Sequence, residues 1–303
     1  MRVLISGGTG MIGTRLTRSL LADGHQVTVL TRRPEAARLP QGAAALGWDG
    51  CTSDGWGARM NAVDAVVNLA GERLAHWPWT PAFKRRVWDS RVDGGSALTE
   101  AIRAASTRPR VLIQASGVNF YGPHGPELLD ESAPVGEDFL ARLCLAWEAS
   151  TAEVEALGVR RAVIRTAVVL DRREGILPIL ALPVQLFAGG PLGSGRQGLP
   201  WIALDDQVAA IRFLLDSAAA RGAFNLSTPQ PVSSADFVRA VARVLRRPYW
   251  LPVPAFALRL ALGEMSALVL DGAFVQPRRL VDLGFRFKYE SPADALRALY
   301  PGR

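Results

Sequence analysis

The chain has 303 residues, 49% of them hydrophobic, and a formal charge of +7. This length and hydrophobicity suit one large or two ordinary cores and exclude an intrinsically disordered protein. The charge comes from 33 Arg and two Lys that are interleaved with acidic residues along the chain rather than gathered into a patch. We therefore expect no nucleic-acid partner, because phosphate backbones are bound by clustered basic residues.

Targeting and metal-binding patterns are also absent from the sequence. The first residues lack the basic segment and apolar core of a signal peptide. The longest apolar stretches, 176–189 and 255–270, are broken by proline or by charged residues, whereas a membrane span needs about 20 apolar residues. Two cysteines and three histidines are too few for a disulfide framework or a His/Cys metal site. We expect a cytoplasmic protein without membrane association or metal.

The first 165 residues alternate short apolar runs with longer amphipathic segments. This alternation predicts a parallel sheet covered by helices on both faces. We therefore predict an α/β fold in which residues 1–165 form a Rossmann-type doubly wound parallel sheet. The predicted strands are 3–6, 27–30, 43–46, 65–69, 111–115 and 161–165, and the predicted helical segments are 11–22, 81–105 and 137–157.

Beyond residue 165 the alternation loosens into a Pro- and Gly-rich region, 176–200, followed by mixed helices and short strands. We predict that residues 166–303 form a smaller, mixed α/β lobe that binds the substrate. Within it, residues 201–227 are expected to cross back to the first domain. They include the run 201–204, a helix with Asp205 as its N-cap, and a late strand at 222–227.

A glycine-rich turn follows the first predicted strand. Glycines at 7, 10 and 13 lead into a helix with apolar residues on one face, a context typical of dinucleotide binding. Glycine lets phosphate oxygens approach the backbone, and the helix N-terminus adds N–H donors. The alternative is a tight turn that holds no ligand. The predicted cofactor contacts are Gly7, Thr9, Gly10, Met11, Ile12 and Gly13.

The second predicted strand ends in Arg32 and Arg33, with no acid in place. In dinucleotide folds an acid at this point favours NAD, whereas arginine accommodates the 2′-phosphate of NADP. A charge-assisted hydrogen bond of this kind contributes about 1.5–3 kcal/mol. The sequence therefore predicts NADP(H) as cofactor, the alternative being that both arginines are ordinary loop residues.

Two further positions are candidates for the adenosine half of the cofactor. Leu69, Ala70 and Gly71 follow the fourth strand, where small residues let the backbone pass close to the ribose or diphosphate. Asp49 could accept a hydrogen bond from the adenine amine, or it could be a turn residue before Gly50.

Several motifs together resemble the extended short-chain dehydrogenase/reductase group: GGTGMIG, NLAG, ASGVNFYG and RTAVVL. Longer segments, among them WPWTPAFKRRVWDSRV, WIALDD and PVPAFALRLALGE, resemble its atypical NAD-dependent epimerase/dehydratase-like branch, the epimerase family proteins (YfcH-like). The resemblance covers nearly the whole chain. It implies a Rossmann domain with bound NADP(H), a C-terminal substrate lobe, and a possible homodimer formed through the helices near 81–105 and 137–157.

The resemblance breaks at the catalytic pair. Extended reductases generally use a Tyr-x-x-x-Lys pair in which the lysine lowers the tyrosine pKa, so that the phenol can exchange a proton with the substrate. Here Leu140, Cys144 and Glu148 stand where the resemblance places the tyrosine, the lysine and a following acid. Ordinary dehydrogenase and epimerase chemistry is therefore in doubt, although cofactor binding is not affected.

Ser116 and Tyr121 are the remaining catalytic candidates. Ser116 matches the family serine and could bond a substrate carbonyl, or it could only cap the strand end. Tyr121 could replace the missing acid, although the family position it matches is usually structural. Arg91 and Lys84 suit an anionic substrate or are ordinary helix-surface charges. Likewise, the loop 189–196 with Arg196 could bind an anion or simply cross between elements.

Two functions are consistent with these observations. The first is an NADP(H)-dependent oxidoreductase or epimerase-like enzyme acting on a small molecule, and the sequence favours it. The second is a non-catalytic NADPH-binding sensor or regulatory protein. Hydrolase and P-loop kinase functions are disfavoured, because the chain has neither a Gly-x-Ser-x-Gly elbow nor a Gly-Lys-Ser/Thr turn.

Overall fold

A seven-stranded parallel sheet forms the centre of the protein. The structure is a computed structural model and describes residues 1–302. Its strand order is β3-β2-β1-β4-β5-β7-β10, with the direction of winding reversing between β1 and β4. The predicted doubly wound Rossmann-type sheet is therefore confirmed. The strands are β1 (Arg2–Ser6), β2 (Gln26–Thr31), β3 (Ala44–Gly47), β4 (Ala65–Asn68), β5 (Val111–Gly117), β7 (Arg160–Thr166) and β10 (Gly222–Leu226).

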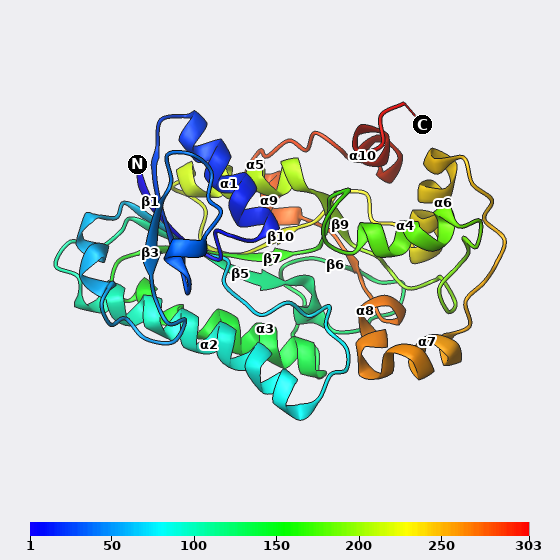
Figure 1. Cartoon of the computed structure of the whole chain (residues 1–303), viewed down its shortest axis with the longest axis horizontal. Helices are drawn as coiled ribbons and strands as arrows, with labels where there is room; N and C mark the ends of the chain where they lie inside the picture. Colours follow the sequence, from blue (N-terminus) through cyan, green and yellow to red (C-terminus); the bar gives the residue numbers. More distant parts are fainter. Residues whose placement is uncertain (303) are drawn as a thin grey trace.

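Helices cover both faces of this sheet (Figure 1). Successive side chains of a strand point to opposite faces, and β1 shows the consequence. Its Val3 and Ile5 pack with Leu16 in the core below α1, whereas Leu4 packs with Leu98 of α2 in a second core on the other face. One face carries α1 (Met11–Ala22) and α5 (Leu204–Asp216), and the other carries α2 (Pro81–Ala104) and α3 (Phe139–Ala149).

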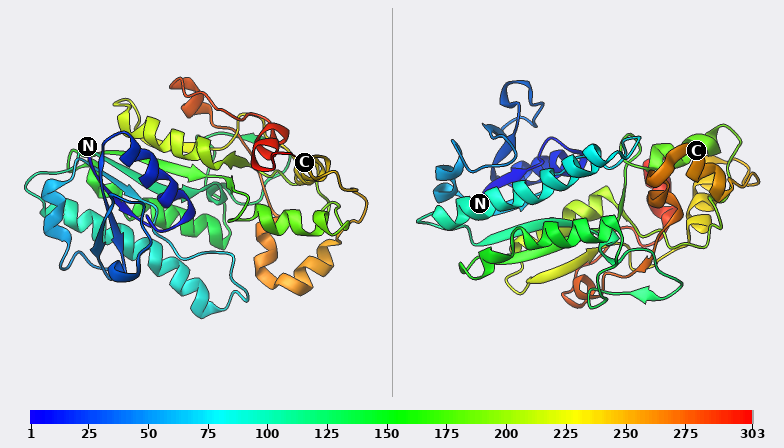
Figure 2. Two further views of the ribbon diagram at one scale, coloured as in Figure 1. Left: turned by 45° about the horizontal axis from the view of Figure 1, so that its top comes forward. Right: turned by 90° about the horizontal axis from the view of Figure 1, so that it is seen from below.

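The C-terminal lobe lies beyond the end of the sheet at which the strands finish (Figures 1 and 2). Its core is a separate apolar cluster around Leu180, Trp201, Phe237 and Leu296. The lobe contains α4 (Leu177–Gln185), α6 (Ser234–Leu245), α7 (Ala255–Leu262), α8 (Ala267–Leu270) and α10 (Pro292–Leu299), while α9 (Arg278–Asp282) packs on β10.

Several short elements complete the fold. Two small parallel pairs join β8 (Val168–Leu170) to β9 (Trp201–Ala203) and β6 (Leu128–Leu129) to β11 (Phe274–Val275). Within residues 1–302, short 3₁₀ segments lie at Pro34–Ala36, Gly57–Ala62, Val118–Tyr121, Ala152–Glu155 and Gly263–Ser266.

Residues 201–227, which are predicted to return to the first domain, do so only in part. The late strand β10 joins the main sheet beside β7, and α5 packs against α1. However, Trp201–Ala203 pairs with β8 outside that sheet. Asp205 is not the N-cap of α5, and that prediction was wrong. The helix begins at Leu204, and the Asp205 carboxylate instead pairs with Arg15 at 2.8 Å and Lys288 at 3.4 Å.

The amphipathic segment predicted over 137–157 is two elements rather than one. Asp138 caps α3 by accepting from the Ala141 N–H at 2.8 Å, and the helix ends at Ala149. The Ser150 carbonyl then accepts from the Thr99 hydroxyl of α2 at 2.9 Å, and the Ser150 hydroxyl donates to the Trp147 carbonyl at 2.7 Å. These side-chain bonds replace backbone bonds that would have continued the helix.

None of the helices within residues 1–302 has both the length and the hydrophobicity of a membrane-spanning segment. The same residues contain no group of three or more His, Cys, Asp or Glu side chains arranged to hold a metal ion.

An ion pair where the central strands β1 and β4 begin gives a pH-dependent prediction. Asp64 accepts from the Arg2 side chain at 2.9 Å and the Arg2 N–H at 2.7 Å, and these bonds lower the pKa of Asp64 from 3.8 to about 2. The folded state prefers the carboxylate, so its stabilisation is complete above the ordinary aspartate pKa and is lost as the pH falls from about 4 to about 2. Asp64→Asn should reduce this acid loss of stability, measured by urea unfolding between those pH values. An equal reduction in Asp54→Asn, on an exposed turn, would contradict it.

Candidate functional site

A cleft of about 2000 Å³ runs between the sheet and the C-terminal lobe. Its floor is formed by residues that follow β1, β2, β4, β5 and β7, and its far wall by α4 and residues 264–273. In doubly wound sheets, ligands bind beyond the carboxyl ends of the strands, where the strand order reverses. That reversal lies between β1 and β4, so this cleft is the candidate site.

The cleft brings together every residue predicted to hold the cofactor. Three segments far apart in sequence supply them, because each follows a strand of the same parallel sheet. They are Gly7, Thr9, Gly10, Met11, Ile12 and Gly13 after β1, Arg32 and Arg33 after β2, and Leu69, Ala70 and Gly71 after β4.

The glycine turn packs directly on backbone. Gly7 has a φ of +71°, and a Cβ there would lie 2.5 Å from the Leu69 carbonyl oxygen. A Cβ at Gly13 would lie 2.4 Å from the Gly7 carbonyl oxygen. Gly10 is the N-cap of α1, and no side chain caps this helix. The first amides of α1 therefore have no intrahelical acceptor and can bind an anion in the cleft.

The end of β2 presents two unpaired cations. Arg32 and Arg33 are exposed at the cleft, and no carboxylate in the described part of the chain lies within ion-pair distance of either. Nearby, Asp49 accepts from the N–H groups of Thr52 and Cys51, both at 2.8 Å, and these bonds lower the pKa of Asp49 to about 2. Asp49 is thus a turn residue, and because it also lines the cleft, the adenine contact stays open.

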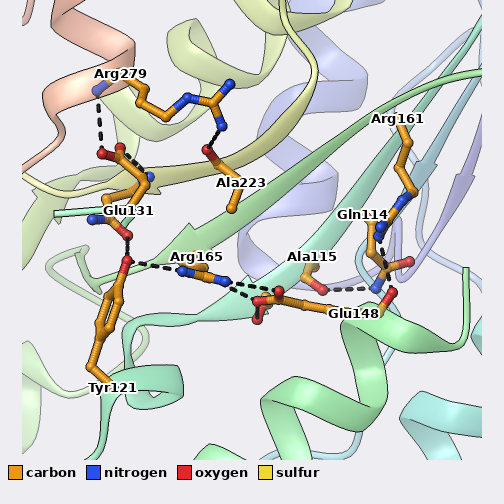
Figure 3. A network of polar contacts seen from close by, with 11 residues as sticks. Gln114, Ala115, Tyr121, Glu131, Glu148, Arg161, Arg165, Ala223 and Arg279 are labelled. Carbon is orange, nitrogen blue, oxygen red and sulfur yellow. Dashed lines mark hydrogen bonds and ion pairs between the residues drawn. The ribbon is translucent and has the colours of Figure 1, made fainter. Parts of the chain in front are cut away.

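The hydroxyl of Tyr121 lies in a buried polar network with Arg165 and Glu148 (Figure 3), and the hydroxyl of Ser116 joins this network through Glu148. Ser116 donates to Glu148 at 2.7 Å, and Glu148 forms an ion pair with Arg165 at 2.9 Å. Arg165 donates to the Tyr121 hydroxyl at 3.1 Å, which in turn donates to Asn225 at 2.7 Å. The network therefore ties β5, α3, β7 and β10 together.

Neither hydroxyl is among the groups that line the cleft. Tyr121 is fully buried, and burial raises the pKa of its phenol further. This placement agrees with the structural alternative for Tyr121. The proton of Ser116 points to Glu148, so any bond to a substrate would require the hydroxyl to turn or to act as an acceptor.

A second buried network lies beneath the cleft. Ser6 at the end of β1 donates to Asn68 of β4 at 2.5 Å, and Asn68 donates to Gln114 of β5 at 2.9 Å. This network was not predicted from the sequence. The available signal was a polar side chain inside a buried apolar strand, as in the run from Val111 to Ser116.

The positions of the missing catalytic pair are apolar and buried. Leu140 and Cys144 lie on α3, and burial raises the pKa of the Cys144 thiol to about 11. Arg91 of α2 is buried beside them and lines the cleft. Lys84, in contrast, lies outside the cleft lining, where it pairs with Glu264 and stacks 5.2 Å from the Phe139 ring.

The loop 189–196 has a packing explanation for its glycines. A Cβ at Gly190 would lie 1.9 Å from the Leu251 carbonyl oxygen, and Gly193 donates to the Val253 carbonyl at 2.9 Å. Arg196 is exposed and lies outside the cleft lining. The arrangement agrees with a connecting loop rather than an anion site.

Comparison with known proteins identifies the family. The sequence profile of the NAD dependent epimerase/dehydratase family matches residues 3–227. The chain belongs to this family. A second profile, a domain of unknown function called DUF1731, matches residues 253–299 in the lobe.

The similar proteins agree with this assignment and confirm the resemblance to the epimerase family proteins. The chloroplastic SDR39U1 homolog of Arabidopsis thaliana is 40% identical over 99% of this chain and 86% of its own length. YfhF of Bacillus subtilis is 35% identical over 100% of this chain and 99% of its own length. Human epimerase family protein SDR39U1 (isoform 2), solved with NADPH, is 31% identical with a TM-score of 0.89 over the whole of both chains.

Gly13 should resist even the smallest substitution. Alanine normally stabilises a helix relative to glycine by about 0.5–1 kcal/mol. At Gly13 the added methyl would meet the backbone of Gly7 and Gly8, so Gly13→Ala should instead destabilise the protein by about 1–3 kcal/mol. Chemical denaturation measures the change. Gly94→Ala is the matched control on α2, where the nearest atom is at 3.4 Å; equal effects of the two variants would refute the packing argument.

Proposed function

We propose that this member of the family binds NADPH in the cleft and acts as a reductase or epimerase-like enzyme on a small molecule. One observation carries the proposal: a glycine turn closed against backbone lies in the same cleft as two unpaired arginines at the end of β2. The binding of NADPH by human SDR39U1 supports the choice of cofactor.

The residues present fit this cofactor. The uncapped amides of Met11 and Ile12 would hold the diphosphate, and Arg32 and Arg33 would hold the 2′-phosphate. Leu69, Ala70 and Gly71 would border the adenosine and diphosphate. Bound NADPH would supply a hydride to the substrate.

The lobe would hold the substrate. Its contribution to the cleft is mainly apolar, and it includes Ile179, Met265, Leu268 and Leu270. We assign cofactor binding to residues 1–165 together with the returning segment 201–227, and substrate binding to the remainder of 166–303. We also propose that the protein forms a homodimer. The two copies would meet through α2 and α3, which together cover one face of the sheet (Figure 1).

Ser116 is the better of the two catalytic candidates. It lies near the end of β5, two residues before Val118 of the cleft lining, and its hydroxyl donates to the Glu148 carboxylate. That pair could take up or release a proton at the Ser116 oxygen. Tyr121, bonded to both Arg165 and Asn225, would support the strand ends instead.

The choice of cofactor has a direct test. Trp48 and Trp79 line the cleft, so quenching of tryptophan fluorescence can follow titrations with NADPH and NADH. NADPH should bind about tenfold more tightly than NADH. Arg32→Ala and Arg33→Ala should weaken NADPH binding and leave NADH binding unchanged, whereas Arg38→Ala, an exposed arginine outside the cleft lining, should change neither. Failure of the wild-type protein to bind either dinucleotide would refute the proposed function.

Catalysis separates the enzyme from a sensor. With NADPH and a panel of aldehydes and ketones, an enzyme should oxidise the cofactor with at least one substrate. Ser116→Ala should then lower turnover by about 100-fold, a typical contribution of proton transfer, with the affinity for NADPH preserved. Ser132→Ala, at an exposed site outside the cleft lining, is the control. Tight NADPH binding without turnover on any substrate would favour the sensor.

A further inference from the structure

Arg91 is a buried cation that opens into the cleft. Its residue is 9% exposed, and its guanidinium stacks on the Trp147 ring of α3, 4.8 Å from the centroid. The guanidinium also lies close to Gly71, where a Cβ would be 3.0 Å from the Arg91 Cζ. The glycine after β4 therefore leaves the room that the guanidinium occupies.

The charge of Arg91 has no partner in the described part of the chain. Its Nη1 donates to the carbonyls of Glu72 and Val87, both at 3.1 Å, whereas no described residue accepts from Nε or Nη2. No carboxylate of residues 1–302 lies within ion-pair distance of it. The Glu72 carboxylate raises its pKa only from farther away, and the neighbouring Cys144 is a neutral thiol.

An unpaired buried charge is costly unless a ligand completes it. Burial lowers the pKa of Arg91 to about 10, so the side chain is still charged at neutral pH. Nε and Nη2 form one edge of the guanidinium, and their parallel N–H groups match the two oxygens of a carboxylate. The free edge is thus the edge that recognises such a group.

We propose that Arg91 is the receptor for a carboxylate on the substrate, so that the small molecules turned over in this cleft are carboxylic acids. The proposal rests on the proposed function, since it places the acid beside the cofactor. The alternative ligand for this edge of Arg91 is the diphosphate of the cofactor, whose oxygens could accept the same two hydrogen bonds. The position favours the substrate, because the diphosphate has its own amides at the glycine turn, while Arg91 lies against α3 at Cys144 and Trp147.

The test compares benzoate with its neutral analogue benzamide, by calorimetric titration of the protein saturated with NADPH. Benzoate should bind at least tenfold more tightly than benzamide. Arg91→Gln should reduce benzoate affinity to that of benzamide. Arg91→Lys keeps the charge but not the two parallel donors, so it should also lose most of this preference. Arg85→Gln, an exposed arginine on the same helix, should retain it.

Each other outcome is decisive. Equal binding of benzoate and benzamide by the wild-type protein, or an unchanged benzoate preference in both Arg91 variants, would overturn the proposal. The proposal would also be overturned if Arg91→Gln lowered NADPH affinity tenfold but left benzoate affinity unchanged. In that case the Nε and Nη2 groups of Arg91 would bind the cofactor rather than the substrate. If Arg91→Gln does not fold, the benzoate preference of Arg91→Lys provides the test instead. If the wild-type protein binds no NADPH, the proposed function fails, and the same titrations without cofactor still test Arg91.

Discussion

The close approach of the glycine turn to the backbone after β4 is the constraint on which the site depends. With no side chain at Gly7 or Gly13, α1 sits directly on the turn, and the turn sits directly on Leu69 and Ala70. The two halves of the sheet wind in opposite directions from this point. The contact therefore fixes where the cleft opens, and it makes the floor of the cleft from backbone amides that an anion can reach.

Buried hydrogen bonds hold the strand ends around this contact. Ser6, Asn68 and Gln114 connect β1, β4 and β5 beneath the floor, and Glu148 and Arg165 connect α3 to β7 beside it. In a medium of low polarity such bonds are strong, and breaking one leaves a costly unpaired group. The strand ends are thus held in register by bonds between the protein's own side chains.

The sequence predicted best what depends on local pattern. The apolar alternation of the strands and the glycine spacing indicated the sheet and all the cleft-lining residues assigned to the cofactor, because each follows its strand directly. The sequence was a poor guide where a side chain's role depends on a partner far away in the chain. Asp205 has the chemistry of an N-cap, but Arg15 and Lys288 bind its carboxylate. The hydrogen-bond partners of Ser116 and Tyr121, Glu148 and Asn225, lie 32 and 104 residues away and were also not predicted. No local pattern contains that information.

The charges around α3 limit the chemistry that the cleft can support. Arg165 is neutralised by Glu148, whereas Arg91 is not neutralised by any residue the structure describes. The thiol of Cys144, with a pKa of about 11, and the phenol of Tyr121, with a raised pKa, both keep their protons at neutral pH. An arginine stabilises a negative charge but does not give up a proton. Arg91 can therefore hold an oxyanion but cannot protonate one. Under the proposed function, the proton that accompanies the hydride would be exchanged by the Ser116–Glu148 pair.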